Sequence, residues 1–283
     1  MQRILIQLDT DPLPSVFDRV VAVDAGVDQL FSYGGVTPDN VVSLVHGAIF
    51  TRGPKDLKST AIFVGGSDVI AGDRLVKTIR DTFFGPMRVS VLADSNGSNT
   101  TAAAAVRAAN RHLDLANCTA LVLGGTGPVG QRAARILARQ GATVRVASRS
   151  VDRAEQTCAE LRKDVPEAKL LPASSDGNAA EETLRGADLL IAAGAAGVQF
   201  LTRNQWSGAN VQVAIDLNAV PPIGLEGIAV TDTAQERDGV ICYGAIGIGG
   251  TKMKVHKAAI QQLFESNDQI LQTEEVYSIA RNF

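Results

Sequence analysis

The segment 120–130, with the sequence ALVLGGTGPVG, constrains the fold more than any other part of the chain. A short apolar run of strand length leads directly into glycines at positions 125, 127 and 130. Because glycine has no Cβ, this spacing lets backbone N–H groups at the start of the next helix, predicted over 131–139, approach a pyrophosphate. Glycine turns also join strands to helices in proteins that bind no nucleotide, but here a second apolar strand, 142–147, completes the expected strand–helix–strand unit. The pattern predicts a dinucleotide site.

The residues after that second strand indicate which dinucleotide binds. NAD sites usually carry an Asp or Glu at this point, which holds the ribose 2′-hydroxyl. This chain has Ser148 and Arg149 there, with Arg153 one helical turn later, and arginine suits a 2′-phosphate. The predicted cofactor is therefore NADP. Its predicted contacts are Gly125, Thr126, Gly127, Pro128, Val129, Gly130, Ser148, Arg149 and Arg153, with Ala193, Asn218 and Gly247 at the ends of later strands.

Short apolar runs alternate with helix-length segments along the chain, which predicts the α/β class. With 283 residues and 45% hydrophobic residues, the chain is long enough for two domains, each a mainly parallel sheet with covering helices. We expect one domain over 1–114 plus 256–283 and a Rossmann-type NADP domain over 115–255. The expected strands are 4–8, 30–33, 61–64, 89–92, 120–123, 142–147, 169–172, 188–193, 211–217 and 239–243, and the expected helices include 100–112, 131–139, 252–264 and 273–280.

Composition excludes several classes of partner. The net charge of −3 comes without a basic stripe, so we expect no nucleic acid and no membrane surface as partner. The apolar run at 4–6 is too short for a signal peptide, and no segment has the length of a membrane span, so we expect a cytoplasmic protein. The cysteines and histidines are scattered, which predicts reduced thiols and no metal site; they are Cys118, Cys158 and Cys242, and His46, His112 and His256.

Two polar clusters follow predicted strands, where open parallel sheets bind their ligands. The first, 94–101, reads DSNGSNTT. A helix cap needs only one such residue, so the excess of polar side chains predicts a ligand contact, with capping as the alternative interpretation. The second, 216–222, reads DLNAVPP. Turn chemistry explains its prolines but not Asp216, which lies inside the predicted apolar strand 211–217.

A third cluster, 247–254, reads GIGGTKMK. Its lysines are expected near a helix N-terminus, where the helix dipole disfavours a cation, so their placement suggests a functional use. Two solvated lysines that begin a helix are the alternative. Near the amino terminus, Ser15 and Asp18 almost form a capping box, and this structural role is sufficient for both residues.

With these positions in hand, the chain resembles the NADP-dependent methylene-tetrahydromethanopterin dehydrogenases of methylotrophic bacteria. The resemblance covers essentially the whole length, and several of the strings that carry it are unusual. They lie at 9–18, 36–41, 59–66, 83–86, 94–101, 125–130, 218–222 and 247–252. The resemblance implies that the enzyme reversibly oxidises the methylene bridge of a reduced pterin to a methenyl group and passes hydride directly to NADP.

The resemblance also implies roles for individual residues. It assigns Lys252 to the active site beside the pterin, and the first domain to pterin binding. The implied substrate contacts are Ser15, Phe17, Asp18, Asp94, Asn96, Ser98, Asn99, Thr100 and Thr101. A homo-oligomer, trimer or hexamer, is implied as well.

The implied reaction needs no catalytic triad, and the sequence shows none. Hydride loss from a carbon between two nitrogens leaves a delocalised cation, so no general base has to remove a proton, and the absence of a catalytic triad is expected. Two alternatives stay open at this stage. A methylene-tetrahydrofolate dehydrogenase shares the reacting centre, and an NADPH-binding sensor shares the glycine motif.

Overall fold

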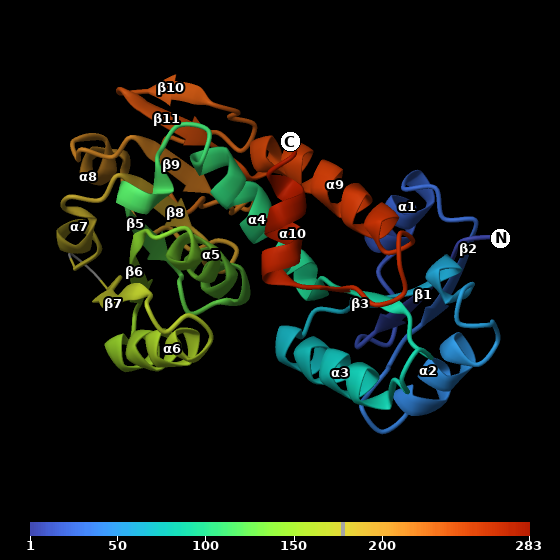
Figure 1. The fold of residues 1–283 in the computed structure, drawn as a ribbon. Coiled ribbons are helices and arrows are strands. Elements are labelled where there is room, and N and C mark those ends of the chain that lie inside the picture. The colour runs from blue at the N-terminus through green and yellow to red at the C-terminus, as the bar shows by residue number, and fades with distance from the viewer. Residues whose placement is uncertain (177–178) are drawn as a thin grey trace. The chain divides into compact units, whose positions relative to one another are not determined.

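The computed structural model describes residues 1–176 and 179–283 and divides into two compact units (Figure 1). The first unit comprises Met1–Thr100 and Met253–Phe283, and the second comprises Thr101–Lys252. The sequence predicted boundaries after residues 114 and 255. The compact units instead divide after Thr100, inside α4 (Ser98–Ala109), and after Lys252.

The first unit contains a five-stranded sheet in the order β12-β4-β3-β1-β2, with every neighbouring pair parallel. Its strands are β1 (Ile4–Asp9), β2 (Gln29–Tyr33), β3 (Thr60–Gly65), β4 (Ser90–Ala93) and β12 (Ile270–Leu271). The carboxyl ends of the strands therefore lie along one edge of the sheet, and the amino ends along the other.

Helices cover both faces of this sheet. On one face, α2 (Val41–Ile49) and α3 (Val69–Thr82) pack their valine, leucine and isoleucine side chains against alternate residues of the strands. On the other face lie α1 (Val16–Asp24) and the part of α9 (Ala245–Gln262) that follows Met253 (Figure 1). There the ring of His256 stacks on Phe63 with 5.6 Å between centroids. The last helix is α10 (Thr273–Ala280).

The second unit contains a seven-stranded sheet in the order β10-β11-β9-β8-β5-β6-β7. All pairs are parallel except the edge hairpin of β10 with β11. The strands are β5 (Thr119–Leu123), β6 (Thr143–Ser148), β7 (Lys169–Ser174), β8 (Leu189–Ala192), β9 (Val213–Asp216), β10 (Gln235–Arg237) and β11 (Val240–Tyr243). The helices are α5 (Pro128–Arg139), α6 (Val151–Asp164), α7 (Ala179–Leu184) and α8 (Arg203–Ser207). The order β7-β6-β5-β8-β9 is that of a Rossmann-type domain, so the predicted fold class is confirmed.

The structure differs from the sequence prediction at α9. The predicted helix began at Lys252, but α9 begins at Ala245 and includes Gly247, Gly249 and Gly250. The low helix propensity of glycine argued against a helix start at Ala245. Tertiary packing overrides this propensity, because Gly247 lies so close to Asp232 that a Cβ there would overlap the carbonyl oxygen of Asp232. Lys252 consequently lies inside the helix, so the expected position at a helix N-terminus is wrong.

Candidate functional site

The glycine turn of the second unit joins β5 to α5. Gly124 has φ +69°, a conformation that favours glycine, and Gly127 is the N-cap of α5 with Pro128 as first helical residue. A Cβ on Gly130 would overlap the carbonyl oxygen of Gly124, so this glycine is required for close packing of the helix on the turn. Because Gly127 has no side chain, the N–H groups of the first turn face no capping group and are suited to an anion.

The positions predicted to receive the 2′-phosphate follow β6. Ser148 is buried, and its Oγ accepts hydrogen bonds from the N–H of Ser150 at 3.3 Å and the hydroxyl of Thr126 at 3.5 Å. Arg149 and Arg153 are exposed. Within the described residues, no carboxylate forms an ion pair with either guanidinium. The site therefore offers two positive charges that the protein does not neutralise.

One residue in this region was missed by the sequence analysis. Ser175 follows β7 and is only 9% exposed, and its N–H donates to the carbonyl oxygen of Ser148 at 2.9 Å. Among residues 1–176 and 179–283, its hydroxyl finds no hydrogen-bond partner and is buried. A buried hydroxyl of this kind costs free energy unless a ligand completes it, so Ser175 joins the candidate cofactor residues. No sequence signal could have singled it out from other serines that follow strands.

The loop after β9 is built around Asp216. This aspartate is 1% exposed, and its carboxylate accepts from the N–H of Asn218 at 3.0 Å and of Leu225 at 2.8 Å. Burial raises its pKa, while the backbone hydrogen bonds oppose that rise. The Asn218 amide donates to the carbonyl oxygen of Pro222 and accepts from the N–H of Val220. Asp216 thus holds the loop, and a cofactor contact of Asn218 stays a prediction.

The other two predicted strand-end contacts lie on backbone that packs tightly. Ala193 is half-buried and donates its N–H to the carbonyl oxygen of Leu123 at 2.9 Å. Gly247 lies in the first turn of α9 against Asp232. Packing explains the glycine at 247, and its contact with the cofactor stays a prediction.

In the first unit, two carboxylates converge on Gly65 at the carboxyl end of β3. A Cβ there would lie 3.1 Å from Asp9 Oδ2 and 3.7 Å from Asp18 Oδ2. Asp9 is fully buried and accepts from the N–H of Asp11 at 2.9 Å and of Ser15 at 3.1 Å. Ser15 also caps α1, since its hydroxyl accepts from the N–H of Asp18 at 3.3 Å, which confirms the predicted cap.

Thr10 and Phe17 are the sequence neighbours of these two aspartates, Thr10 next to Asp9 and Phe17 next to Asp18. Phe17 is half exposed, and its ring lies 6.5 Å from that of His256. Thr10 was missed by the sequence analysis: its hydroxyl is buried without a hydrogen-bond partner, next to the bare Cα of Gly66. In the described part of each unit, one buried hydroxyl without a partner thus lies at the carboxyl edge of the sheet.

The polar cluster after β4 is largely internal. Asp94 is 2% exposed and accepts from the N–H groups of Asn99 and Thr100 and from the Thr100 hydroxyl, at 2.9, 3.0 and 2.6 Å. The Asn99 amide donates to the carbonyl oxygen of Ala93 and accepts from the hydroxyl of Thr273. Ser98 is buried as well, and its hydroxyl donates to the carbonyl oxygen of Ser95.

Two predicted substrate residues of this cluster remain accessible. Asn96 is exposed in a left-handed conformation with φ 54°, and Thr101 is half-buried. The capping interpretation accounts for the buried members, whereas Asn96 and Thr101 are open to a ligand. Ligand contacts of the cluster stay a prediction.

Lys252 and Lys254 lie within α9, in its third turn. Two residues along an α-helix correspond to about 200°, so the two side chains leave opposite faces. Lys252 is half-buried and Lys254 is exposed.

Among the residues described, no group of three or more His, Cys, Asp or Glu side chains could hold a metal ion, and no helix is long and apolar enough to cross a membrane.

Comparisons with known proteins match two different families to the two parts of the chain. Residues 16–96 match the family model for the N-terminal domain of methylene-tetrahydromethanopterin dehydrogenase, and residues 107–231 match that for shikimate / quinate 5-dehydrogenase. Among solved structures, the quinate dehydrogenase of Corynebacterium glutamicum in complex with NAD superposes with a TM-score of 0.55 at 13% identity, covering 100% of this chain and 99% of that one. This likeness shows the fold.

Two relatives from Methylorubrum extorquens extend over almost the whole chain. The bifunctional protein MdtA is 43% identical and covers 99% of this chain and 98% of its own length. The NAD(P)-dependent methylenetetrahydromethanopterin dehydrogenase is 33% identical, with 94% and 93% covered. The chain therefore belongs to the methylene-tetrahydromethanopterin dehydrogenase family.

Proposed function

We propose that this chain catalyses the reversible NADP-dependent oxidation of methylene-tetrahydromethanopterin to methenyl-tetrahydromethanopterin by direct hydride transfer. The family supports the reaction, since the chain matches a named dehydrogenase of this pterin over 94% of its length. The observation that supports NADP as the cofactor is the loop after β6, which has Ser148, Arg149 and Arg153 in place of an acidic residue.

The residues of the second unit fit this cofactor. The turn at 124–127 exposes backbone N–H groups that would hold the pyrophosphate, and Arg149 with Arg153 would hold the 2′-phosphate. The buried Ser175 hydroxyl, which has no partner in the part of the chain that the structure describes, would hydrogen-bond to the adenosine end. Bound NADP supplies the hydride acceptor. The loop fixed by Asp216 would cover the nicotinamide end, because it follows a strand on the opposite side of the central β5 from Ser148.

The first unit supplies groups that suit a pterin. A pterin ring presents N–H donors, and the carboxylates of Asp9 and Asp18 that converge on Gly65 are acceptors. Asp9 accepts the backbone N–H groups of Asp11 and Ser15, which gives it a role in the loop, and Asp18 is the substrate contact that we propose. We assign Lys252 the task of orienting the pterin by hydrogen bonding, because a cation pressed against the developing positive charge would oppose the reaction.

Purified protein tests this proposal directly. Methylene-tetrahydromethanopterin and NADP should give NADPH and the methenyl pterin in equal amounts, and the same enzyme should run the reaction backwards. A parallel assay with methylene-tetrahydrofolate measures kcat/KM for the other pterin. NADPH binding without turnover of either pterin would refute the enzyme assignment.

We further propose that the protein forms a homo-oligomer, a trimer or hexamer, in the cytoplasm. An exposed apolar stripe supports an interface between copies: Val16, Val20 and Val23 are 67%, 56% and 64% exposed and lie within about 60° of one another around α1, opposite its buried residues. The three cysteines are free and buried, which agrees with a reducing compartment.

The mass of the particle in solution tests the interface. Val20→Glu should shift the particle toward the monomer in light scattering. Val42→Glu, a change of another exposed valine on α2, is the matched control and should leave the mass unchanged. A monomeric wild-type protein would contradict the proposal.

A further inference from the structure

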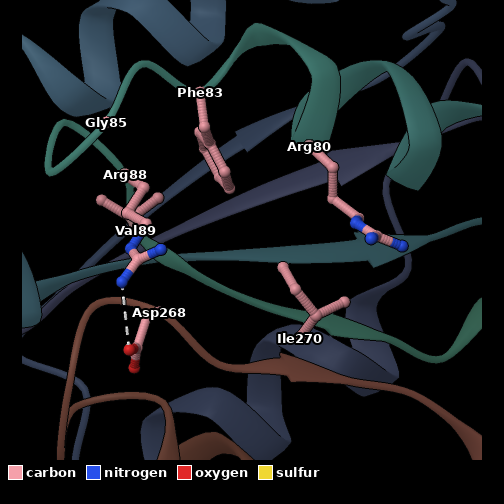
Figure 2. A pocket seen from close by; sticks show the side chains of 7 residues that line it. All are labelled: Arg80, Phe83, Gly85, Arg88, Val89, Asp268 and Ile270. Carbon is pink, nitrogen blue, oxygen red and sulfur yellow. Dashed lines mark hydrogen bonds and ion pairs between the residues drawn. The ribbon is translucent and has the colours of Figure 1, made fainter.

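A pocket of about 410 Å³ lies in the first unit at the amino ends of two strands (Figure 2). It is lined by Arg80, Phe83, Gly85, Arg88, Val89, Asp268 and Ile270. Val89 directly precedes β4, and Ile270 is the first residue of β12. Because all strands of this sheet are parallel, the pocket lies at the opposite edge from Asp9, Gly65 and Asp94. It is therefore separate from the candidate substrate residues.

The lining carries one positive charge that the protein does not balance. Arg88 pairs with Asp268 at 3.1 Å, and the other oxygen of that carboxylate accepts from the hydroxyl of Ser266 at 2.7 Å. Within the described part of the chain, the guanidinium of Arg80 has neither a carboxylate nor a hydrogen-bond acceptor. Arg80 lies in the last turn of α3, whose dipole offers only a diffuse partial charge. Its donors thus remain available to a ligand.

The walls between the charged groups are apolar. Figure 2 shows the Phe83 ring and the Ile270 side chain on opposite sides of the pocket, with Arg80 at one end and the paired Arg88 and Asp268 at the other. Val89 is fully buried at the base, and Phe83 and Ile270 are half-buried. A flat or compact apolar group between Phe83 and Ile270 would bury apolar surface on both sides.

The rim of the pocket is formed before any ligand arrives. Asn267 donates hydrogen bonds to the carbonyl oxygens of Pro86 at 3.2 Å and Arg88 at 3.1 Å. These bonds tie the segment before β12 to the segment before β4. Little conformational entropy is then lost on binding at this place, which favours even a small ligand.

We propose that this pocket binds a small organic anion, a carboxylate or a phosphate monoester on a flat apolar body. The anion would pair with Arg80 and the body would lie between Phe83 and Ile270. The volume suits one small molecule, since ligand pockets typically measure about 300–1,000 Å³. The proposal does not rest on the dehydrogenase activity.

Isothermal titration calorimetry with defined probes tests the pocket. The protein is first saturated with NADP, which occupies the phosphate-binding residues of the second unit. Benzoate and phenyl phosphate represent the two head groups, and whichever binds more tightly identifies the anion that the pocket prefers. Benzyl alcohol lacks the charge and inorganic phosphate lacks the ring, so both should bind at least about tenfold more weakly than the better probe.

Three variants assign the binding to the pocket. Arg80→Gln should weaken the better probe at least about tenfold, and Phe83→Ala should weaken it as well. Arg80→Lys keeps the charge without the planar fork and should give an intermediate affinity. Arg74→Gln is the matched control, because Arg74 is an exposed arginine of the same helix outside the pocket, and it should leave the affinity within about twofold.

The outcomes that would overturn the proposal are equally defined. They are an absence of binding at about 10 mM benzoate or phenyl phosphate, and binding that Arg80→Gln leaves unchanged. The melting temperature and the dehydrogenase activity of each variant serve as fold controls. Both should stay at the wild-type value for Arg80→Gln, since Arg80 lies at the edge of the sheet opposite the candidate substrate residues and its guanidinium has no partner to lose among the residues that the structure describes.

Discussion

Two glycines in the middle of α9 have no steric reason to be glycine. A Cβ at Gly249 or Gly250 would meet no atom within 4 Å, whereas one at Gly247 would overlap a carbonyl oxygen. Glycine in a helix interior costs about 0.5–1 kcal/mol relative to alanine. Each of Gly249→Ala and Gly250→Ala should therefore stabilise the protein by about that amount, which raises Tm by about 1–4 °C in a chain of this size.

The two variants should differ in activity, because they lie on different faces. Gly249 is three residues before Lys252 and shares its face, while Gly250 is four residues before the exposed Lys254. If the pterin contacts the Lys252 face, a methyl group at Gly249 takes space that the ligand needs. We expect Gly249→Ala to raise KM for the pterin about tenfold, equivalent to about 1.4 kcal/mol, with little change in KM for NADP.

A third helical glycine gives the matched control. Gly47 in α2 is exposed, and a Cβ added there would also meet nothing within 4 Å, so Gly47→Ala should raise Tm without a kinetic effect, as should Gly250→Ala. Melting curves and steady-state kinetics on the three variants separate stability from substrate binding. If Gly249→Ala stabilised the protein and left kcat/KM for the pterin unchanged, the Lys252 face would not contact substrate.

Five further substitutions test single residues. Arg149→Ala should weaken NADP binding by about 1.5–3 kcal/mol and leave NAD nearly unchanged, and an equal loss for both would assign Arg149 to the fold. Ser175→Ala should weaken NADP binding without lowering Tm, since the lost hydroxyl has no partner among the described residues, and a lower Tm would argue against this reasoning. Lys252→Ala should lower kcat at least about tenfold with KM for NADP little changed, and Lys254→Ala should be silent; the reverse result would move the site to the other face of α9. Arg237 lowers the pKa of Asp232 by hydrogen bonding, so this carboxylate stabilises the fold above its unfolded pKa and the stability is lost as pH falls through its lower folded pKa; Asp232→Asn should lower the unfolding free energy at pH 7 and converge with wild type in acid.

Most strands of both sheets could be predicted because the central strands are buried on two faces, which demands continuous apolar runs. All ten expected strands are present, with shifts of one or two residues at their ends. Two edge strands could not be predicted. The strand β12 has only two residues and exists through its pairing with β4, and β10 has the polar sequence QER and exists through its hairpin with β11. Neither carries a local signal.

The sequence predicted the glycine turn of the candidate site but missed some of the side chains that lie near the sheet edges. The glycine turn and the arginines after β6 follow from local spacing, which the sequence displays. The partnerless hydroxyls of Thr10 and Ser175 depend on which groups the folded chain brings near them, so no local pattern could mark them. The start of α9 was missed for the same reason, because the packing of Gly247 on Asp232 is a tertiary contact.

Aspartates at the ends of apolar strands have a common role in this chain, which changes how such residues are interpreted. Asp9 and Asp216 end their strands, and Asp94 directly follows one. Each is buried, and each carboxylate accepts at least two backbone N–H groups from the loop that follows. An ionised carboxylate in a low-dielectric interior needs such donors, and by gathering them it fixes the loop. The polar excess after β4 therefore reflects loop construction in its buried members, and a ligand contact at these sheet edges stays a prediction for neighbouring groups such as Asn96 and Thr10.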